Sequence, residues 1–65
     1  MNGKTLIKIL QEHGWRLDRV RGSHHILIKE GRRSIPVPVH GNRDLPLALV
    51  RAIIRQAGLN KEDII

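Results

Sequence analysis

Residues 22–39 read GSHHILIKEGRRSIPVPV and carry the clearest secondary-structure signal in this 65-residue chain. A turn at Gly22-Ser23 precedes a predicted strand over residues 24–29, with the apolar run Ile26-Leu27-Ile28, and Glu30-Gly31 ends it. The next run, residues 34–39, is rich in β-branched side chains, and three of them alternate so that they share one face: Ile35, Val37 and Val39. Two strands joined by a short turn predict an antiparallel hairpin.

The two prolines of the second run place it within the sheet. Pro36 and Pro38 lack the backbone N–H that a strand ladder needs, so we expect this strand at an edge, where it resists pairing with other chains. Upstream, residues 15–21 alternate weakly, with Trp15 and Leu17 on one face, and predict another strand that ends at the Gly22 turn. Together the three strands predict an antiparallel meander.

Apolar residues at helical spacing flank the strands on both sides. The first helix is predicted over about residues 3–13 and stops at Gly14, with the stripe Leu6, Ile9, Leu10 and His13. A second helix is predicted after Asp44, a natural N-cap, and ends at Gly58, with the apolar face Leu47, Val50, Ile53, Ile54 and Ala57. After it, either Asn60 caps a last helical turn that lays Ile64 and Ile65 on the body, or the tail frays.

The element order is therefore helix, three strands, helix. This order predicts an α+β fold in which both helices pack on one face of the sheet, because each has a single apolar stripe, and the other face stays open. Residues 1–65 are expected to form one domain. The chain has no cysteine, which suits a reducing compartment, and we find no secretory or membrane-spanning segment, so the cytoplasm is the expected location.

Charge and aromatic content narrow the choice of ligand. Twelve Lys and Arg against six Asp and Glu give a net charge of +6. Basic proteins also bind acidic proteins and anionic lipid surfaces, but this charge favours nucleic acid as the ligand. Trp15 is the only aromatic residue, so single-stranded bases have no set of stacking platforms, and RNA would be bound through phosphates, 2′-hydroxyls and shape.

Six basic residues lie on or between the predicted hairpins and would form one band if the strands pair as expected: Arg16, Arg19, Arg21, Lys29, Arg32 and Arg33. Such a band would bind RNA phosphates, and the binding would weaken with salt. It could equally be a scattered solvated surface, or receive the acidic surface of a partner protein.

Several blocks of the sequence together resemble the HicA toxin family over residues 4–59. They are Gly14-Trp15, the basic residues 19–21, Gly22-Ser23-His24-His25, and residues 37–46 and 53–59. The resemblance implies a double-stranded-RNA-binding-domain-like α-β-β-β-α fold. It also implies a ribosome-independent mRNA endoribonuclease, the toxin of a type II toxin–antitoxin pair, neutralised by a HicB antitoxin. In that family the histidine of the Gly-Ser-His block is catalytic, which carries over to His24, with Gly22 beside it.

Histidine suits this chemistry because imidazole accepts or donates a proton near pH 7. RNA cleavage without metal needs a base for the 2′-hydroxyl and an acid for the departing 5′-oxygen, and one histidine supplies only one of them at a time. Candidates for the second transfer are His25, His40, water and the phosphate itself. We expect Gly22, Ser23, His25 and His40 as auxiliary residues of the site.

Strand parity complicates the assignment to His24. His24, Ile26 and Ile28 share one face, and His25 and Leu27 share the other. If Ile26 and Ile28 are core, His24 begins on the core side, in a shallow notch at the strand entrance or bonded to a carbonyl as a partly buried histidine. His25 would then lie on the open face.

The remaining histidines have simpler interpretations. His40 follows the edge strand and is either a solvated loop residue or a phosphate ligand near the active site. His13 is expected to act as a cation at the C-terminus of the first helix. His24 and His25 point oppositely and no third ligand has suitable spacing, so we expect no metal site, and no cofactor.

The sequence therefore predicts an mRNA interferase of HicA type with His24 as general acid or base. The alternative is a non-catalytic RNA-binding module of the same fold. A DNA-binding helix-turn-helix protein is disfavoured, because two helices that flank three strands leave no adjacent helix pair.

Overall fold

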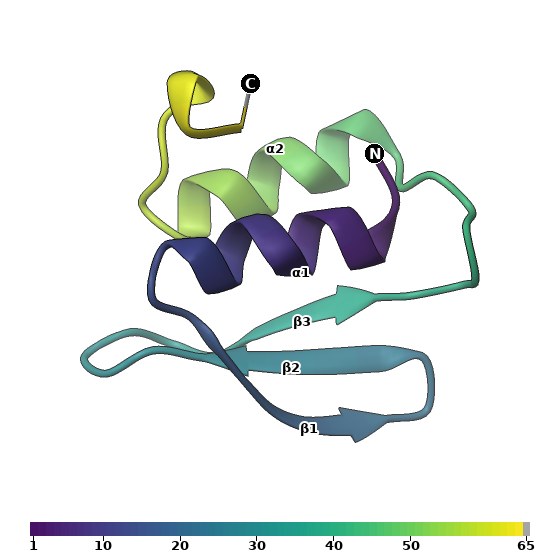
Figure 1. Ribbon diagram of the computed structural model, residues 1–65, viewed down its shortest axis with the longest axis horizontal. Coiled ribbons are helices and arrows are strands. Elements are labelled where there is room, and N and C mark those ends of the chain that lie inside the picture. The colour runs from purple at the N-terminus through teal and green to yellow at the C-terminus, as the bar shows by residue number, and fades with distance from the viewer. Residues whose placement is uncertain (65) are drawn as a thin grey trace.

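The structure, a computed structural model, describes residues 1–64, apart from the side chains of Lys61 and Ile64. Its elements in chain order are α1 (Gly3–Glu12), β1 (Arg16–Arg21), β2 (His24–Ile28), β3 (Ile35–Pro38), α2 (Leu47–Gln56) and a short 3₁₀ helix, η1 (Lys61–Ile64). The antiparallel sheet has the order β1-β2-β3, and both long helices lie on the same side of it (Figure 1). The predicted α+β architecture is confirmed, and the proline-containing strand lies at an edge.

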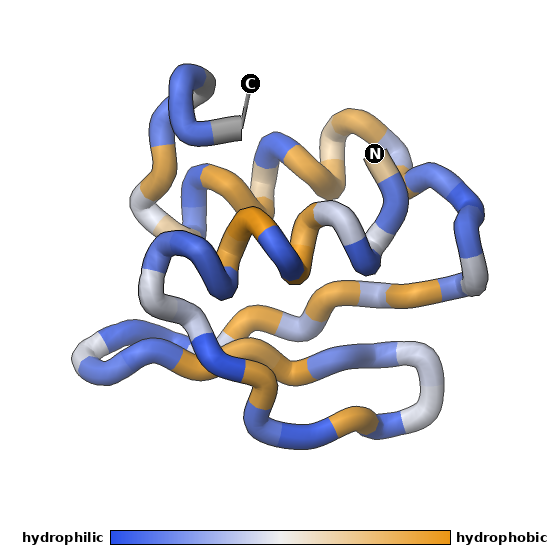
Figure 2. Tube along the Cα trace, viewed as in Figure 1, coloured by the Kyte–Doolittle hydropathy of each residue, from blue (hydrophilic) through white to orange (hydrophobic). Residues whose placement is uncertain are grey.

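The core lies between the helices and the nearer face of the sheet. In the pairing of β2 with β3, Leu27 is opposite Ile35 and His25 is opposite Val37, so these four residues face the helices. Twelve residues form one buried apolar cluster: Leu6, Ile7, Leu10, Trp15, Leu27, Ile35, Val37, Leu45, Val50, Ile53, Ile54 and Ala57. Strand β1 is mostly hydrophilic and all six of its residues are exposed (Figure 2).

The register shows which face of β2 points to the core, and it differs from one of the sequence-based expectations. Leu27, at 0% exposure, is in the core, whereas Ile26 and Ile28 lie on the opposite face; Ile26 is buried there at 9% exposure but lies outside the core cluster. The condition that would have put His24 on the core side is therefore not met. The buried residues Ile35 and Val37 of β3 decide this, because their partners in β2 are Leu27 and His25.

The first helix ends much as predicted, and its start has a cap that the sequence analysis missed. Asn2 is the N-cap of α1, and its side-chain oxygen accepts a hydrogen bond from the backbone nitrogen of Thr5 at 2.9 Å. At the other end His13 is the C-cap, and Gly14 adopts a φ of 93° as it leaves the helix.

The prediction that Asp44 caps the second helix is wrong. The N-cap position of α2 is Pro46, with no side-chain hydrogen bond. Asp44 instead forms an isolated backbone bridge to Asn2, and its carboxylate lies 3.3 Å from the amino nitrogen of Met1. Leu47, expected in the apolar face, is 62% exposed and lies outside the core cluster.

The last described residues form a helical turn, η1, and not a frayed tail. Asn60 does not cap it through its side chain; its backbone nitrogen donates to the carboxylate of Asp63 at 2.8 Å. The expected packing of Ile64 and Ile65 lies outside the described residues. No helix within residues 1–64 is long and apolar enough to cross a membrane.

Candidate functional site

A two-residue turn holds the start of β2. Arg21 and His24 are the pair that closes the hairpin, so Gly22 and Ser23 are its only loop residues. Gly22 has a φ of 60°, whereas Ser23 has no positive φ. Glycine at the first central position is what a type II′ turn requires, and this turn matches the twist of the two strands. His24 is thereby fixed at the first position of β2.

His24 is exposed on the face of the sheet that the helices leave open. Its partners across the ladder are Arg21 in β1 and Pro38 in β3. Its imidazole makes no hydrogen bond within residues 1–64, so the side chain is not the partly buried, carbonyl-bonded histidine considered above. The imidazole is free to meet a ligand on the open face.

His25 lies on the helix side, half-buried between its ladder partners Val20 and Val37. Its Nδ1 atom is buried and has no hydrogen-bond partner among the described residues. The expectation that His25 is the open-face residue is therefore wrong, for the reason of register given above. Because the two histidine side chains leave opposite faces of β2, they cannot approach one phosphate from the same side.

A β-bulge collects three arginines on the face of His24. In a regular strand, Arg19 and Arg21 would lie on the face opposite to Arg16. The register shifts between Leu17 and Arg19, however, and leaves Asp18 without a partner in β2. After the bulge, Arg16 pairs with Ile28, Arg19 with Ile26 and Arg21 with His24, so all three arginines share the face of His24. The guanidinium of Arg19 forms an ion pair with Asp18. We call Arg16, Arg19, Arg21 and His24 the open-face site.

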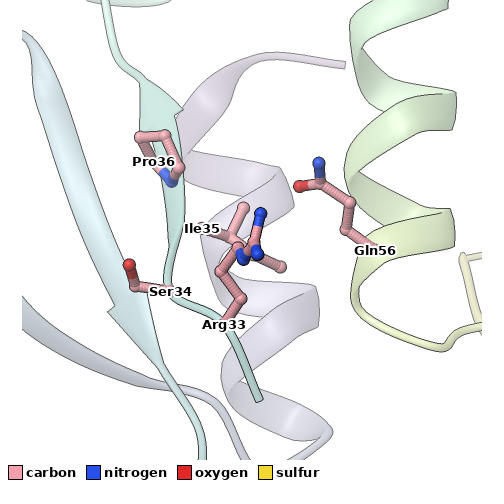
Figure 3. A pocket seen from close by; sticks show the side chains of 5 residues that line it. All are labelled: Arg33, Ser34, Ile35, Pro36 and Gln56. Atoms are coloured by element: carbon pink, nitrogen blue, oxygen red, sulfur yellow. The ribbon is translucent and has the colours of Figure 1, made fainter.

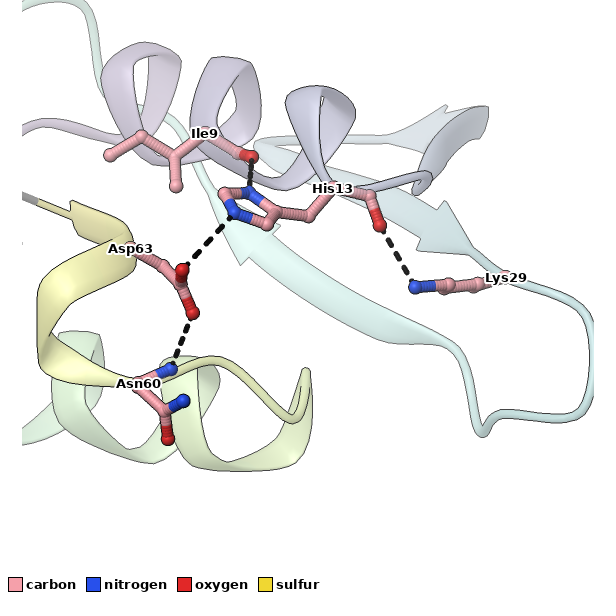
Figure 4. A network of polar contacts seen from close by, with 5 residues as sticks. All are labelled: Ile9, His13, Lys29, Asn60 and Asp63. Carbon is pink, nitrogen blue, oxygen red and sulfur yellow. Dashed lines mark hydrogen bonds and ion pairs between the residues drawn. The ribbon is translucent and has the colours of Figure 1, made fainter.

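The other three basic residues of the predicted band lie elsewhere, beyond the opposite end of β2. Lys29 is half-buried, and its Nζ donates to the backbone oxygen of His13 at 2.8 Å (Figure 4). The guanidinium of Arg32 lies against Gly58. Arg33 lines an open hollow between β3 and α2 with Ser34, Ile35, Pro36 and Gln56 (Figure 3). The structure thus brings together three of the six basic residues, not all of them.

His40 is exposed in the loop that follows β3. The preceding residue, Val39, donates from its backbone nitrogen to the carbonyl oxygen of Ser23 at 2.8 Å, which ties this loop to the turn before His24. His40 also accepts a backbone hydrogen bond from Arg43 at 3.1 Å. Its backbone is therefore adjacent to the Gly22-Ser23 turn.

His13 has a structural environment that its sequence position did not reveal. Its Nδ1 lies 2.9 Å from the carbonyl oxygen of Ile9, and its Nε2 lies 3.6 Å from the carboxylate of Asp63 (Figure 4). Together with the bond from Lys29 to its carbonyl, these contacts link α1, the end of β2 and the C-terminal turn. Within residues 1–64, no three His, Asp or Glu side chains cluster closely enough to hold a metal ion.

The site is an exposed imidazole beside arginines on the uncovered sheet face of a small α-β-β-β-α domain, an arrangement typical of proteins that bind polyanions. The family model described as HicA toxin of bacterial toxin-antitoxin matches residues 3–59, so the chain belongs to the HicA toxin family. Among solved structures, a toxin–antitoxin complex from Streptococcus pneumoniae contains a chain that is 40% identical, with a TM-score of 0.80. The match covers 91% of this chain and 98% of that chain. No curated protein matches significantly.

Proposed function

We propose that this protein is a metal-independent mRNA endoribonuclease, the toxin of a type II toxin–antitoxin pair, and that His24 is its general acid or base. Membership of the HicA family supports the class of protein. The observation that carries the chemistry is the place of His24, exposed at the entrance of β2 on the open face, opposite Arg21.

In the proposed reaction the 2′-oxygen of one nucleotide attacks the adjacent phosphorus. A base takes the 2′-hydroxyl proton, the bond from phosphorus to the 5′-oxygen breaks, and an acid gives that oxygen a proton. The products are a 2′,3′-cyclic phosphate and a 5′-hydroxyl. His24 performs one of the two proton transfers. Because His25 lies on the other side of the sheet, the second transfer falls to water, to the phosphate or to His40.

RNA is held on the open face through its phosphates. Arg16, Arg19 and Arg21 supply the positive charge beside His24. Trp15, the single aromatic residue, is 2% exposed in the core, so it offers no surface for a base to stack upon. The binding is therefore electrostatic, and we expect its affinity to fall steeply with salt concentration.

The partner we propose is an antitoxin of HicB type with an acidic surface. The similar solved structure is a toxin–antitoxin complex, and this chain carries a net charge of +6. An acidic protein seated on the open-face site would cover His24 and exclude RNA, with its association slowed at high salt. We expect both proteins in the cytoplasm, where mRNA is available as substrate.

The decisive experiment incubates purified protein with end-labelled RNA in excess EDTA. We expect cleavage, with 2′,3′-cyclic phosphate and 5′-hydroxyl ends, and no cleavage of a substrate that carries a single 2′-deoxy nucleotide at the cut site. RNA that is bound but stays intact would indicate the non-catalytic RNA-binding module instead. Products with a 5′-phosphate, or loss of all activity in EDTA, would contradict the mechanism.

A further inference from the structure

The geometry points to Arg21 as a catalytic residue: its guanidinium would bind the scissile phosphate together with His24 and stabilise the charge that develops on it. This inference rests on the proposed function, which assigns a proton transfer to His24. It separates Arg21 from the other arginines of the open-face site, whose role would be only to hold the RNA.

The first argument is the register. Arg21 and His24 are directly opposite and close the two-residue turn, so their side chains leave the same face from neighbouring Cβ atoms, about 5 Å apart for such pairs. The tight Gly22-Ser23 turn, with its glycine at a φ of 60°, fixes this juxtaposition. A phosphate that reaches the imidazole of His24 therefore lies within reach of the guanidinium of Arg21.

The second argument is the contrast among the three arginines. Arg19 is already paired with the carboxylate of Asp18. Arg16 is opposite Ile28, four residues along β2 from His24, which is about 13 Å in a strand. Arg21 has neither limitation, since no carboxylate within residues 1–64 forms an ion pair with it. It is the cation of this face that is both unpaired and next to His24.

The third argument is chemical. During attack by the 2′-oxygen, the negative charge on the non-bridging oxygens increases, and a guanidinium presents two parallel N–H donors to such oxygens. A donor aimed at developing charge stabilises the transition state more than the ground state. Arginine remains protonated and cannot exchange protons, so the proton transfer stays with His24.

The kinetic test compares Arg21→Ala and Arg21→Lys with the control Arg16→Ala, which removes the same charge from the same face and strand. We expect Arg21→Ala to lower kcat about 10²-fold, the usual effect of losing one such donor, and Arg21→Lys to recover part of it. Arg16→Ala should raise KM with little change in kcat. An Arg21→Ala variant that only raises KM, as Arg16→Ala does, would overturn the inference.

A binding measurement tests the same contact without depending on cleavage. The ring signals of His24 are followed by NMR while a 2′-O-methyl oligoribonucleotide, which cannot be cut, is added to each protein. We expect the signals to shift in the wild type. Arg16→Ala should need more oligonucleotide but reach the same shift at saturation, because it loses a remote phosphate contact. Arg21→Ala should show a smaller shift at saturation, because the phosphate is no longer held beside the imidazole. Equal shifts at saturation for all three, or no shift in the wild type, would overturn the inference. Failure of the wild type to cleave RNA, with the NMR result as expected, would reject the proposed function and with it the catalytic role of Arg21, and would leave only a phosphate contact shared by Arg21 and His24.

Discussion

The two ends of the sheet use the same kinds of side chain in opposite ways. At the end where β2 leads into the loop toward β3, Lys29 donates to the carbonyl of His13, and the ring of His13 contacts Ile9 and Asp63. At the end with the Gly22-Ser23 turn, His24 is exposed, and neither it nor the buried Nδ1 of His25 has a hydrogen-bond partner among the described residues.

This difference separates groups that stabilise the fold from groups that are available to a ligand. A hydrogen bond formed within the protein typically contributes about 1 kcal/mol to the free energy of unfolding. The loop end of the sheet has such bonds, whereas water solvates the exposed His24. We therefore expect substitutions of the hydrogen-bonded side chains at the loop end to change stability, and substitutions of the exposed side chains at the turn end to change activity.

The largest effect should be seen when a histidine from each end of the sheet is replaced by alanine. We expect His24→Ala to lower the rate of RNA cleavage by about 10²- to 10⁴-fold, the contribution of a general acid or base. Its urea midpoint should stay near that of the wild type. His13→Ala should do the reverse, because its ring contacts Ile9 and Asp63 and not the open face. Equal loss of cleavage in both variants at matched folded fraction would break the comparison.

The scaffold beneath the turn end should be sensitive at Gly3. A Cβ atom at this buried position would lie 2.3 Å from the backbone oxygen of Pro38, the residue opposite His24. We expect Gly3→Ala to reduce the free energy of unfolding by about 1–3 kcal/mol, as overpacking does, in urea titrations. Lys4→Ala, at the exposed neighbouring position, is the control. Unchanged stability in Gly3→Ala would show that α1 and β3 are not in such close contact.

A smaller loss is expected at the loop end. Lys29→Met keeps most of the aliphatic stem but removes the bond to the carbonyl of His13, so we expect thermal unfolding to reveal a loss of about 1 kcal/mol. Lys8→Met, at an exposed position on α1, is the matched control. RNA cleavage should survive in both. Impaired cleavage in Lys29→Met alone would place Lys29 among the RNA-binding residues after all.

The smallest effect concerns Asp44. Its ion pair with the Met1 amino group is 79% exposed on the carboxylate side, so Asp44→Ala should change stability by less than about 0.5 kcal/mol. Asn2→Ala removes the true N-cap of α1 and should cost about 1 kcal/mol by chemical denaturation. If Asp44→Ala were the more damaging variant, Asp44 would contribute more to stability than Asn2, and our description of Asn2 as a cap and Asp44 as a weakly paired surface residue would be wrong.

The sequence predicted the order of elements and the edge position of β3, because helical stripes and prolines are local signals. It could not choose the buried face of β2, since Ile26 and Ile28 compete there with Leu27. That choice depends on Ile35 and Val37 across the ladder. The bulge at Asp18 was equally hidden, and without it the shared face of Arg16, Arg19 and Arg21 does not follow from alternation.

The contacts of His13 were beyond sequence analysis for a different reason. Lys29 is 16 residues away from His13, to whose carbonyl it donates, and Asp63 follows His13 by 50 positions, so neither contact leaves a periodic signal in the sequence. By contrast, Gly22, Ser23 and His24 are consecutive in sequence, so the resemblance to the HicA family could mark this block as a candidate site without the fold.

The most direct test of the whole account is a single-turnover comparison of His24→Ala with His25→Ala on the same RNA. The two residues are neighbours in sequence but lie on opposite faces of β2, so only His24 can reach a phosphate bound on the open face. We expect His24→Ala to lose cleavage and His25→Ala to keep most of the wild-type rate when folded. Cleavage retained in His24→Ala and lost in folded His25→Ala would contradict the account.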